Sequence, residues 1–326
     1  MQFPFLAQTT QAHAAEQALL HLLLQLAVII AVARWLGHLA IKLGQPRVVG
    51  EILGGLALGP SLLGGFAPGV FDWLFLRGDG AELYYFSQVG LILLMLQIGM
   101  EFDFSHLRET KNRRAVVAVT LGSLTLPLLG GFGLGWVMQP ALASGVDRSH
   151  FSAFVAVALG ITALPILGRI MADLQLTRTR LGSVAISAAA LNDVVGWVLL
   201  AVVTAVASAK FSAEHLLIQL VGILLLGALF WMVLRPLLHR LARWGVDDHG
   251  GLSLDGAAIL VAVTFLAGAA TIQLGIFAIF GGFAVGVLLF DANALVEAWR
   301  NKIEPFVQFF FLPIFFTYTG LRTDVA

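Results

Sequence analysis

The stretch from Gly160 to Leu200, GITALPILGRIMADLQLTRTRLGSVAISAAALNDVVGWVLL, holds two features that are costly inside a membrane. It is apolar almost throughout, yet Thr162 and Pro165 interrupt one hydrophobic run and the pair Asn192-Asp193 lies within the next. Breaking a helix in lipid and burying a carboxylate there both cost free energy. Two such features in successive runs indicate an ion site, which the other runs enclose.

The composition places most of the chain in lipid. Of its 326 residues, 59% are hydrophobic and only 12% are charged, whereas soluble domains carry about 25% charged residues. A soluble fold of this length could not bury so much apolar surface. The formal net charge of +0 argues against a nucleic-acid partner. The chain has no cysteine and no histidine spacing typical of metal ligands, so we expect no cofactor, no resident metal and no enzyme activity.

Ten hydrophobic runs have the length of a membrane span, which is about 20 residues. They predict an all-α polytopic membrane protein whose single transmembrane domain occupies residues 1–326. The predicted runs are 18–40, 47–66, 84–104, 115–137, 151–172, 182–208, 214–238, 253–272, 275–290 and 304–321.

The distribution of Lys and Arg predicts the orientation of these spans. If the N-terminus lies outside and the spans alternate, the inside loops hold 13 basic residues and the outside segments hold 4. The excess has the same sign in every inside loop, so we expect an N-terminus outside the cell.

Asp193 lies about a dozen residues into the sixth run, near the middle of the bilayer. An ionised carboxylate there costs several kcal/mol unless it is paired, hydrated or protonated. Because a proton and a cation can each neutralise it, we interpret Asp193 as a carrier that exchanges one for the other. The alternative is a carboxylate paired with an arginine for packing alone. Asn192 cannot titrate, and it can donate to Asp193 or offer its carbonyl to an ion.

Thr162, Ala163, Leu164 and Pro165 lie in the middle of the fifth run. A proline removes a backbone donor and frees nearby carbonyls. Transporters use such broken helices as ion sites, although an ordinary proline kink has the same local signature. With Asp193 one span later, we predict a discontinuous fifth helix whose backbone and Thr162 hydroxyl contribute to the ion site.

Other polar residues within the runs suggest secondary roles. Glu51 and Arg169 are predicted at similar depth, which favours a structural ion pair over a transport role. Gln97, in the third run, is a candidate to line a cavity. Thr317 and Thr319, in the tenth run, fit helix packing and pore lining equally well.

Five motifs in this order resemble the monovalent cation:proton antiporters of the second family, which include Kef-type potassium efflux systems and plant CHX exchangers. They are PRVVGEILGGLALGPSLLG, VGLILLMLQIGMEFD, GITALPILGRIMADLQL, AAALNDVVGWVLLA and FLPIFFTYTGLRTD. The resemblance implies an NhaA-like inverted-repeat antiporter fold with a dimerisation domain and a mobile core domain. It also implies a homodimer in the cell (inner) membrane, a crossover helix at Thr162 to Pro165 and an ion-binding acid at Asp193. The Asn-Asp pair, in place of two acids, implies electroneutral exchange.

The chain departs from the family pattern at its end, because relatives of this kind continue for about three more spans. We therefore expect a truncated antiporter that lacks the second broken helix. Three functions remain in view: exchange of Na+ or K+ for H+ by alternating access, a gated potassium efflux pathway of the Kef kind, and a non-transporting membrane component.

Overall fold

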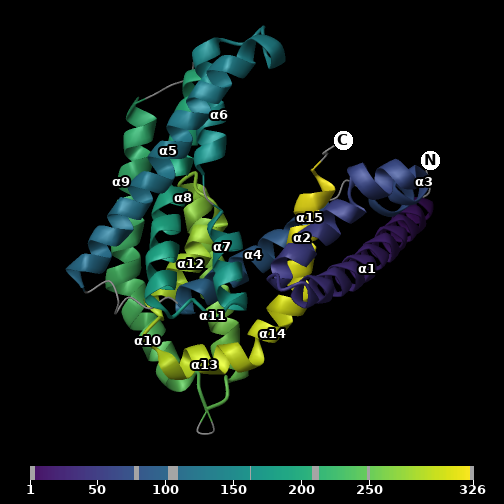
Figure 1. Cartoon of the computed structure of the whole chain (residues 1–326). Coiled ribbons are helices and arrows are strands. Elements are labelled where there is room, and N and C mark those ends of the chain that lie inside the picture. The colour runs from purple at the N-terminus through teal and green to yellow at the C-terminus, as the bar shows by residue number, and fades with distance from the viewer. Residues whose placement is uncertain are drawn as a thin grey trace. The chain divides into compact units, whose positions relative to one another are not determined.

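The computed structural model describes residues 4–76, 81–101, 109–161, 163–207, 213–247 and 250–323, and these residues are almost entirely helical (Figure 1). A single isolated β-bridge pairs Val246 with Leu252. The elements run in the order α1 (Pro4–Lys42), α2 (Arg47–Leu58), η1 (Pro60–Gly64), α3 (Pro68–Phe71), η2 (Asp72–Leu76), α4 (Ala81–Glu101), α5 (Thr110–Leu142), α6 (Arg148–Gly160), α7 (Leu164–Asp173), α8 (Arg180–Ala207), α9 (Ala213–Leu229), η4 (Phe230–Leu234), α10 (Arg235–Trp244), α11 (Leu254–Gln273), α12 (Ala278–Leu288), α13 (Asn293–Lys302), α14 (Glu304–Phe306), η5 (Val307–Phe311) and α15 (Leu312–Leu321).

Seven helical segments among the described residues are long and apolar enough to cross a membrane. They are Glu16–Lys42, Ala81–Glu101, Thr110–Leu142, Arg148–Asp173, Arg180–Leu200, Leu217–Trp244 and Leu254–Gln273. The prediction of a polytopic helical membrane protein is therefore confirmed.

The count of ten spans stays a prediction, because three of the predicted runs form shorter helices. The run 47–66 is divided at Gly59, after the 12 residues of α2. The run 275–290 holds the 11 residues of α12. The run 304–321 is divided among α14, η5 and the 10 residues of α15. Glycine and proline at these points interrupt the regular helix, so length alone does not identify these segments as spans.

The chain forms two compact units, and each is described here by itself. The first unit holds Met1–Leu94 together with Glu297–Ala326, and the second holds Met95–Val296. In the first unit, a hydrophobic cluster joins α1, the end of α2, the segments α3 and η2, the start of α4 and α15. Its buried members are Leu26, Ile29, Leu58, Phe71, Leu74, Phe75, Leu83 and Ile314.

Helices α2 and α15 cross in the first unit at glycines that allow their main chains to touch. A Cβ atom added to Gly55 would lie 2.7 Å from the carbonyl oxygen of Phe316 and 2.7 Å from the Cα of Thr317. A Cβ on Gly59 would lie 2.8 Å from the carbonyl oxygen of Gly320. Such close approach is how helices associate in lipid, where apolar side chains gain little from leaving the solvent.

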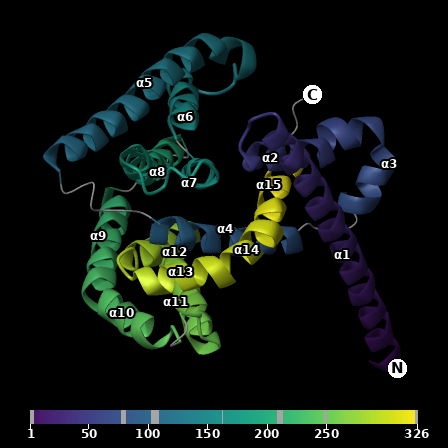
Figure 2. The same ribbon diagram turned by 60° about the horizontal axis from the view of Figure 1, so that its bottom comes forward.

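The second unit contains the stretch that the sequence singles out. Helices α5 and α6 form a hairpin that both ribbon views show (Figures 1 and 2). Its interface is again built on small residues, because a Cβ on Gly131 or on Gly135 would lie 2.7 Å from the Cα of Ala156 or of Ser152, respectively. Helix α8 packs against both members of this hairpin and against α7.

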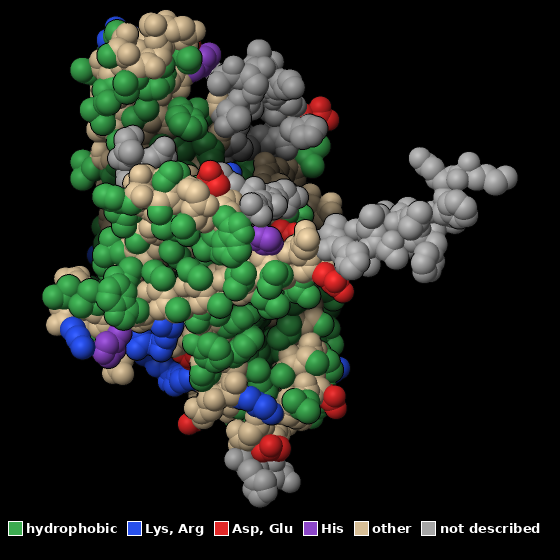
Figure 3. All heavy atoms as spheres, turned by 90° about the vertical axis from the view of Figure 1, so that its right-hand side faces the viewer, with side chains coloured by type: hydrophobic (Ala, Val, Ile, Leu, Met, Phe, Trp, Pro, Cys, Tyr) green, Lys and Arg blue, Asp and Glu red, His purple; other side chains and the backbone are tan. Residues whose placement is uncertain are grey.

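Large hydrophobic side chains remain on the surface of this protein. Leu126 is 72% exposed and Met232 is 74% exposed, and hydrophobic side chains cover much of the face that Figure 3 displays. In water such a surface would be an aggregation hazard, whereas in a bilayer it meets lipid tails. The protein is an integral membrane protein.

Candidate ion-binding site

The predicted fifth span consists of two helices with a break between them. Helix α6 ends at Gly160 and α7 begins at Leu164. Ile161 and Ala163, on the two sides of the break, have ψ angles of 125° and 89°, so neither residue continues a helix. Pro165 lies in the first turn of α7, where a missing N–H costs nothing because that group would have no partner within the helix. The proline therefore starts α7 and does not merely kink a continuous helix.

The two helix ends at the break present opposite partial charges. The last carbonyls of α6 and the first N–H groups of α7 have no partners inside their own helices. The C-terminus of α6 therefore carries a partial negative charge and the N-terminus of α7 a partial positive charge. Ala163, the residue at the N-cap position of α7, makes no side-chain capping hydrogen bond. Thr162, the predicted hydroxyl ligand between the two ends, lies outside the described residues.

Asp193 is located at the positive end of this break. It belongs to α8, its side chain is buried with 3% exposure, and its carboxylate accepts a hydrogen bond from the backbone N–H of Leu164. The structure therefore brings together Asp193 and the Ala163-Leu164-Pro165 segment, two features that lie about thirty residues apart in the chain.

Gly196 keeps the break close to α8. It lies one helical turn after Asp193, on the same face of α8. A Cβ atom at position 196 would lie 2.7 Å from Cγ1 of Ile161, the residue that directly follows α6. The sequence interpretation missed this glycine, although its spacing of three residues from Asp193 was a readable signal.

Asn192 is buried with 1% exposure and is oriented by a neighbouring helix. Its Nδ2 donates to the hydroxyl of Ser123 on α5 at 2.7 Å, and its Oδ1 is buried without a hydrogen-bond partner among the described residues. Its Nδ2 thus has a partner on α5, and the role of its carbonyl oxygen as an ion ligand stays a prediction. Ser123 was missed by the sequence interpretation; its polar hydroxyl within the fourth hydrophobic run was the only sign of it.

Arg169 forms an ion pair within its own helix. Its Nη2 lies 3.2 Å from Oδ1 of Asp173, four residues later on α7. The guanidinium is almost fully buried, and its Nε and Nη1 have no hydrogen-bond partner within the described chain. Glu51 is fully buried on α2, and since it belongs to the other unit, the pair between Glu51 and Arg169 stays a prediction. The i,i+4 spacing of Arg169 and Asp173 would have predicted their pairing.

The remaining predicted residues have distinct surroundings. Gln97 on α4 is 3% exposed, and its Oε1 has no hydrogen-bond partner among the residues described. Thr317 on α15 is fully buried, and its Oγ1 also has no hydrogen-bond partner among the described residues. The exposed Thr319 instead donates to the carbonyl of Phe315 at 3.0 Å, one turn earlier in its own helix. Whether any of the three lines a cavity stays a prediction.

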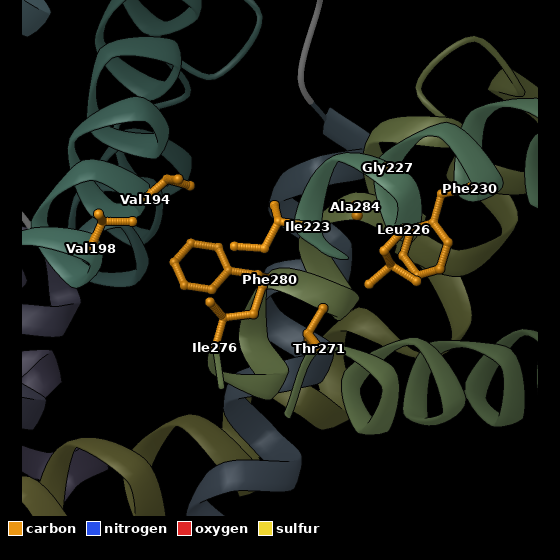
Figure 4. Close-up of a pocket in the computed structure, with 10 residues that line it drawn as sticks. All are labelled: Val194, Val198, Ile223, Leu226, Gly227, Phe230, Thr271, Ile276, Phe280 and Ala284. Carbon is orange, nitrogen blue, oxygen red and sulfur yellow. The ribbon is translucent and has the colours of Figure 1, made fainter. Parts of the chain in front are cut away.

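A pocket of about 160 Å³ is lined on one side by Val194 and Val198 of α8, and its character is apolar (Figure 4). Ile223 of α9, Phe280 of α12 and Ile276, which lies between α11 and α12, line the other side. A cation or an ordered water needs several polar partners, which this lining does not offer. This pocket is therefore no candidate for the cation, and an ion site at the break stays a prediction.

A family model for the transmembrane part of sodium/hydrogen exchangers matches residues 27–326. The chain belongs to the sodium/hydrogen exchanger family. This finding confirms the resemblance to monovalent cation:proton antiporters, whose members are transporters.

The names of relatives within the family mention different cations. This exchanger-family chain is 36% identical to "Cation/H(+) antiporter 18" of Arabidopsis thaliana over 93% of its own length and 37% of the relative. It is 34% identical to "Na(+)/H(+) antiporter NhaS4" of Synechocystis over 94% of its length and 75% of the relative. With "Na(+)/H(+)-K(+) antiporter GerN" of Bacillus cereus the identity is 29%, over 91% and 70%. The chain thus spans little more than a third of the plant relative and about three quarters of the cyanobacterial one.

Proposed function

We propose that this protein exchanges a monovalent cation, Na+ or K+, for protons across a membrane by alternating access, with Asp193 as the shared carrier. The observation that carries the proposal is the buried carboxylate of Asp193 at the N-terminus of α7, beside a break in a membrane helix. The relatives' names support the reaction class, and because those names include both Na+ and K+, we leave both cations in the proposal.

The chemistry of the proposed cycle follows from charge neutrality in a medium of low dielectric constant. An isolated ionised carboxylate at this depth costs several kcal/mol. A proton removes that cost by forming the neutral acid, and a cation removes it by pairing with the carboxylate. The two ligands therefore compete for one group, so loading one releases the other, which is the coupling that an antiporter needs.

The oxygen atoms around Asp193 suit a hard monovalent cation. The free carbonyls at the C-terminus of α6, the Oδ1 of Asn192 and the Asp193 carboxylate supply uncharged and charged oxygen ligands. Thr162 is proposed as a further hydroxyl ligand. The N–H groups of α7 stabilise the ionised carboxylate when neither a proton nor a cation is bound to it. One carboxylate per site gives one cation for one proton, an electroneutral exchange.

The wider architecture is proposed with this mechanism. We propose ten spans in an NhaA-like inverted-repeat fold, with α2, α12 and the η5–α15 segment completing the seven longer spans. The N-terminus is proposed outside, the location is the cell (inner) membrane, and the assembly is a homodimer. Glu51 and Arg169 form the proposed structural ion pair of this arrangement.

The test is transport in proteoliposomes that contain an internal pH indicator, with Na+ and K+ added in turn. We expect the wild-type protein to move protons in response to at least one of the two cations, and Asp193→Asn to lose this response because the amide can neither titrate nor pair with a cation. Asp255→Asn is the matched control, since Asp255 is an exposed acid in the first turn of α11. It should transport like the wild type.

Two results would contradict the proposal. Full exchange by Asp193→Asn would exclude Asp193 as the carrier. A silent wild-type protein that is inserted and monodisperse would favour a non-transporting component, or a component that works only with a further segment or partner.

A further inference from the structure

A second pocket, of about 320 Å³, lies in the second unit between α10 and the start of α13. One wall is a single face of α10, formed by His239, Ala242 and Arg243 at the spacing of one helical turn. The opposite wall is the segment 292–295, at which α13 begins. None of these residues belongs to the break between α6 and α7 that Asp193 contacts.

Asp291 ties the two walls together. Its Oδ2 accepts from Nη2 of Arg235 at 2.9 Å, and its Oδ1 lies 3.2 Å from Nε2 of His239. This carboxylate therefore connects two successive turns of α10 to the chain just before α13, and it offsets the charge of Arg235. The pocket is held open between elements that are fixed to each other.

Arg243 supplies the pocket with a cation. Its Nε makes a long contact of 3.4 Å with the backbone carbonyl of His239, and the described part of the chain places no carboxylate in an ion pair with it. The N–H groups in the first turn of α13 have no partners inside that helix, and the ten-residue length of α13 gives its N-terminus a partial positive charge. Arg243 and the first turn of α13 line the same pocket, and a guanidinium combined with the N–H groups of a helix N-terminus suits phosphate oxygens.

The pocket lies where a membrane helix leaves the hydrocarbon. Residues 217–234 carry no charged side chain and, at 1.5 Å per residue, extend about 27 Å, close to the thickness of the hydrocarbon core. Arg235 follows at once, and its guanidinium lies 4.4 Å from the ring centre of Trp231. Trp244, 52% exposed, ends α10. Tryptophan and arginine at this depth are typical of the lipid headgroup region.

We propose that this pocket binds the headgroup phosphate of an anionic membrane lipid, with Arg243 as the principal cation and the N-terminus of α13 as a second donor. Exposed apolar side chains on the same span, including Leu224, Leu225 and Met232, offer a surface along which the acyl chains lie. This adjoining apolar surface favours a lipid over a free phosphate, because only a lipid uses both halves of the site.

The experiment is thermal unfolding of the purified full chain in a neutral detergent, titrated with phosphatidylglycerol or with phosphatidylcholine. A ligand that binds the folded state raises its Tm by mass action, so we expect phosphatidylglycerol to raise the Tm more than phosphatidylcholine does. Arg243→Gln should weaken the phosphatidylglycerol response about tenfold or more, since one charge-assisted contact is lost. Arg240→Gln is the matched control, because Arg240 is an exposed arginine on the same helix that does not line the pocket.

A second variant keeps the proposal testable if Arg243→Gln does not fold. Ala294→Glu adds a carboxylate to the pocket at an exposed position in the first turn of α13, where an acidic residue is compatible with the helix. It should fold and lose the response to phosphatidylglycerol. Three outcomes would overturn the proposal: an equal response to both lipids, a full response in Ala294→Glu, or a loss in Arg240→Gln as large as in Arg243→Gln. An equal shift by inorganic phosphate at the same concentration would overturn the assignment to a lipid.

Discussion

The α6–α7 break in the second unit and the α2–α15 crossing in the first are both irregular parts of the helical fold, but they bring different groups together. At the break, a carboxylate meets the N-terminus of a helix, and an amide oxygen lacks a hydrogen-bond partner among the described residues. At the crossing, main chains touch through Gly55 and Gly320 beside the buried hydroxyl of Thr317, and the buried Glu51 lies one helical turn before Gly55 on α2. Helix irregularity alone therefore does not identify an ion site. The break differs from the crossing because its buried carboxylate meets the N-terminus of a second helix.

The crossing should be the more sensitive of the two regions to an added methyl group. We expect Gly55→Ala to destabilise the protein by about 3 kcal/mol or more, because the new Cβ would meet main-chain atoms that cannot move independently. Gly130→Ala is the control, since a Cβ at Gly130 would meet no atom within 4 Å. The yield of monodisperse protein and its Tm measure the effect. Equal stability of the two variants would show that the crossing is looser than described.

The break should tolerate an added methyl group at a smaller cost in stability but with a loss of transport. In Gly196→Ala the new Cβ would meet the side chain of Ile161, which can partly give way. We expect a destabilisation of about 1–2 kcal/mol and slower exchange, as the break moves away from α8. The double variant Gly196→Ala/Ile161→Ala removes the clashing atom and should recover exchange. If the double variant is no better than Gly196→Ala alone, Gly196 does not act through Ile161.

Thr317 tests whether the crossing has a polar function. Its hydroxyl is buried without a hydrogen-bond partner in the described structure, so Thr317→Val should leave stability unchanged or raise it by about 1 kcal/mol. Transport should be unchanged if Thr317 only packs against α2. A loss of exchange with normal Tm would instead assign Thr317 to the cation pathway. The crossing would then, like the break, have a role in transport.

The smallest effect is expected outside the bilayer, at the start of α6. Asp147 caps this helix by accepting from the N–H groups of Ser149 and His150 at 2.9 and 3.0 Å. The His150 N–H is the largest cause that holds the pKa of Asp147 below its usual value. A depressed folded-state pKa means that this stabilisation is present above the unfolded-state pKa and is lost as the pH falls through the folded-state pKa.

We therefore expect Asp147→Ala to lower the Tm slightly at about pH 7 and to have a smaller effect at about pH 2, because the charge-dependent part of the cap weakens as the carboxylate becomes protonated. Thermal unfolding at the two pH values measures the difference. An Asp147→Ala deficit of the same size at both pH values would show that the cap does not depend on the charge.

The sequence was sufficient to predict the membrane class, the family and the break. Long apolar runs, the Thr162–Pro165 interruption and the carboxylate at Asp193 are local signals. Long apolar runs suit lipid, whereas an interrupted helix and a buried carboxylate each cost free energy there. The contacts of Gly196 with Ile161 and of Asn192 with Ser123 depend on how helices pack, and no local pattern encodes which faces meet. Helices α2, α12 and α15 were predicted as full spans, because hydrophobicity is continuous across the glycines and prolines that shorten them.

The central claim is that a cation and a proton compete for Asp193. Calorimetric titration of the solubilised protein with NaCl and KCl, in two buffers of different ionisation enthalpy, counts the protons released as the cation binds. The account predicts about one proton per bound cation for the wild type, since a single carboxylate carries either ligand. It predicts no binding to Asp193→Asn. Cation binding without proton release, or equal binding by the two proteins, would contradict it.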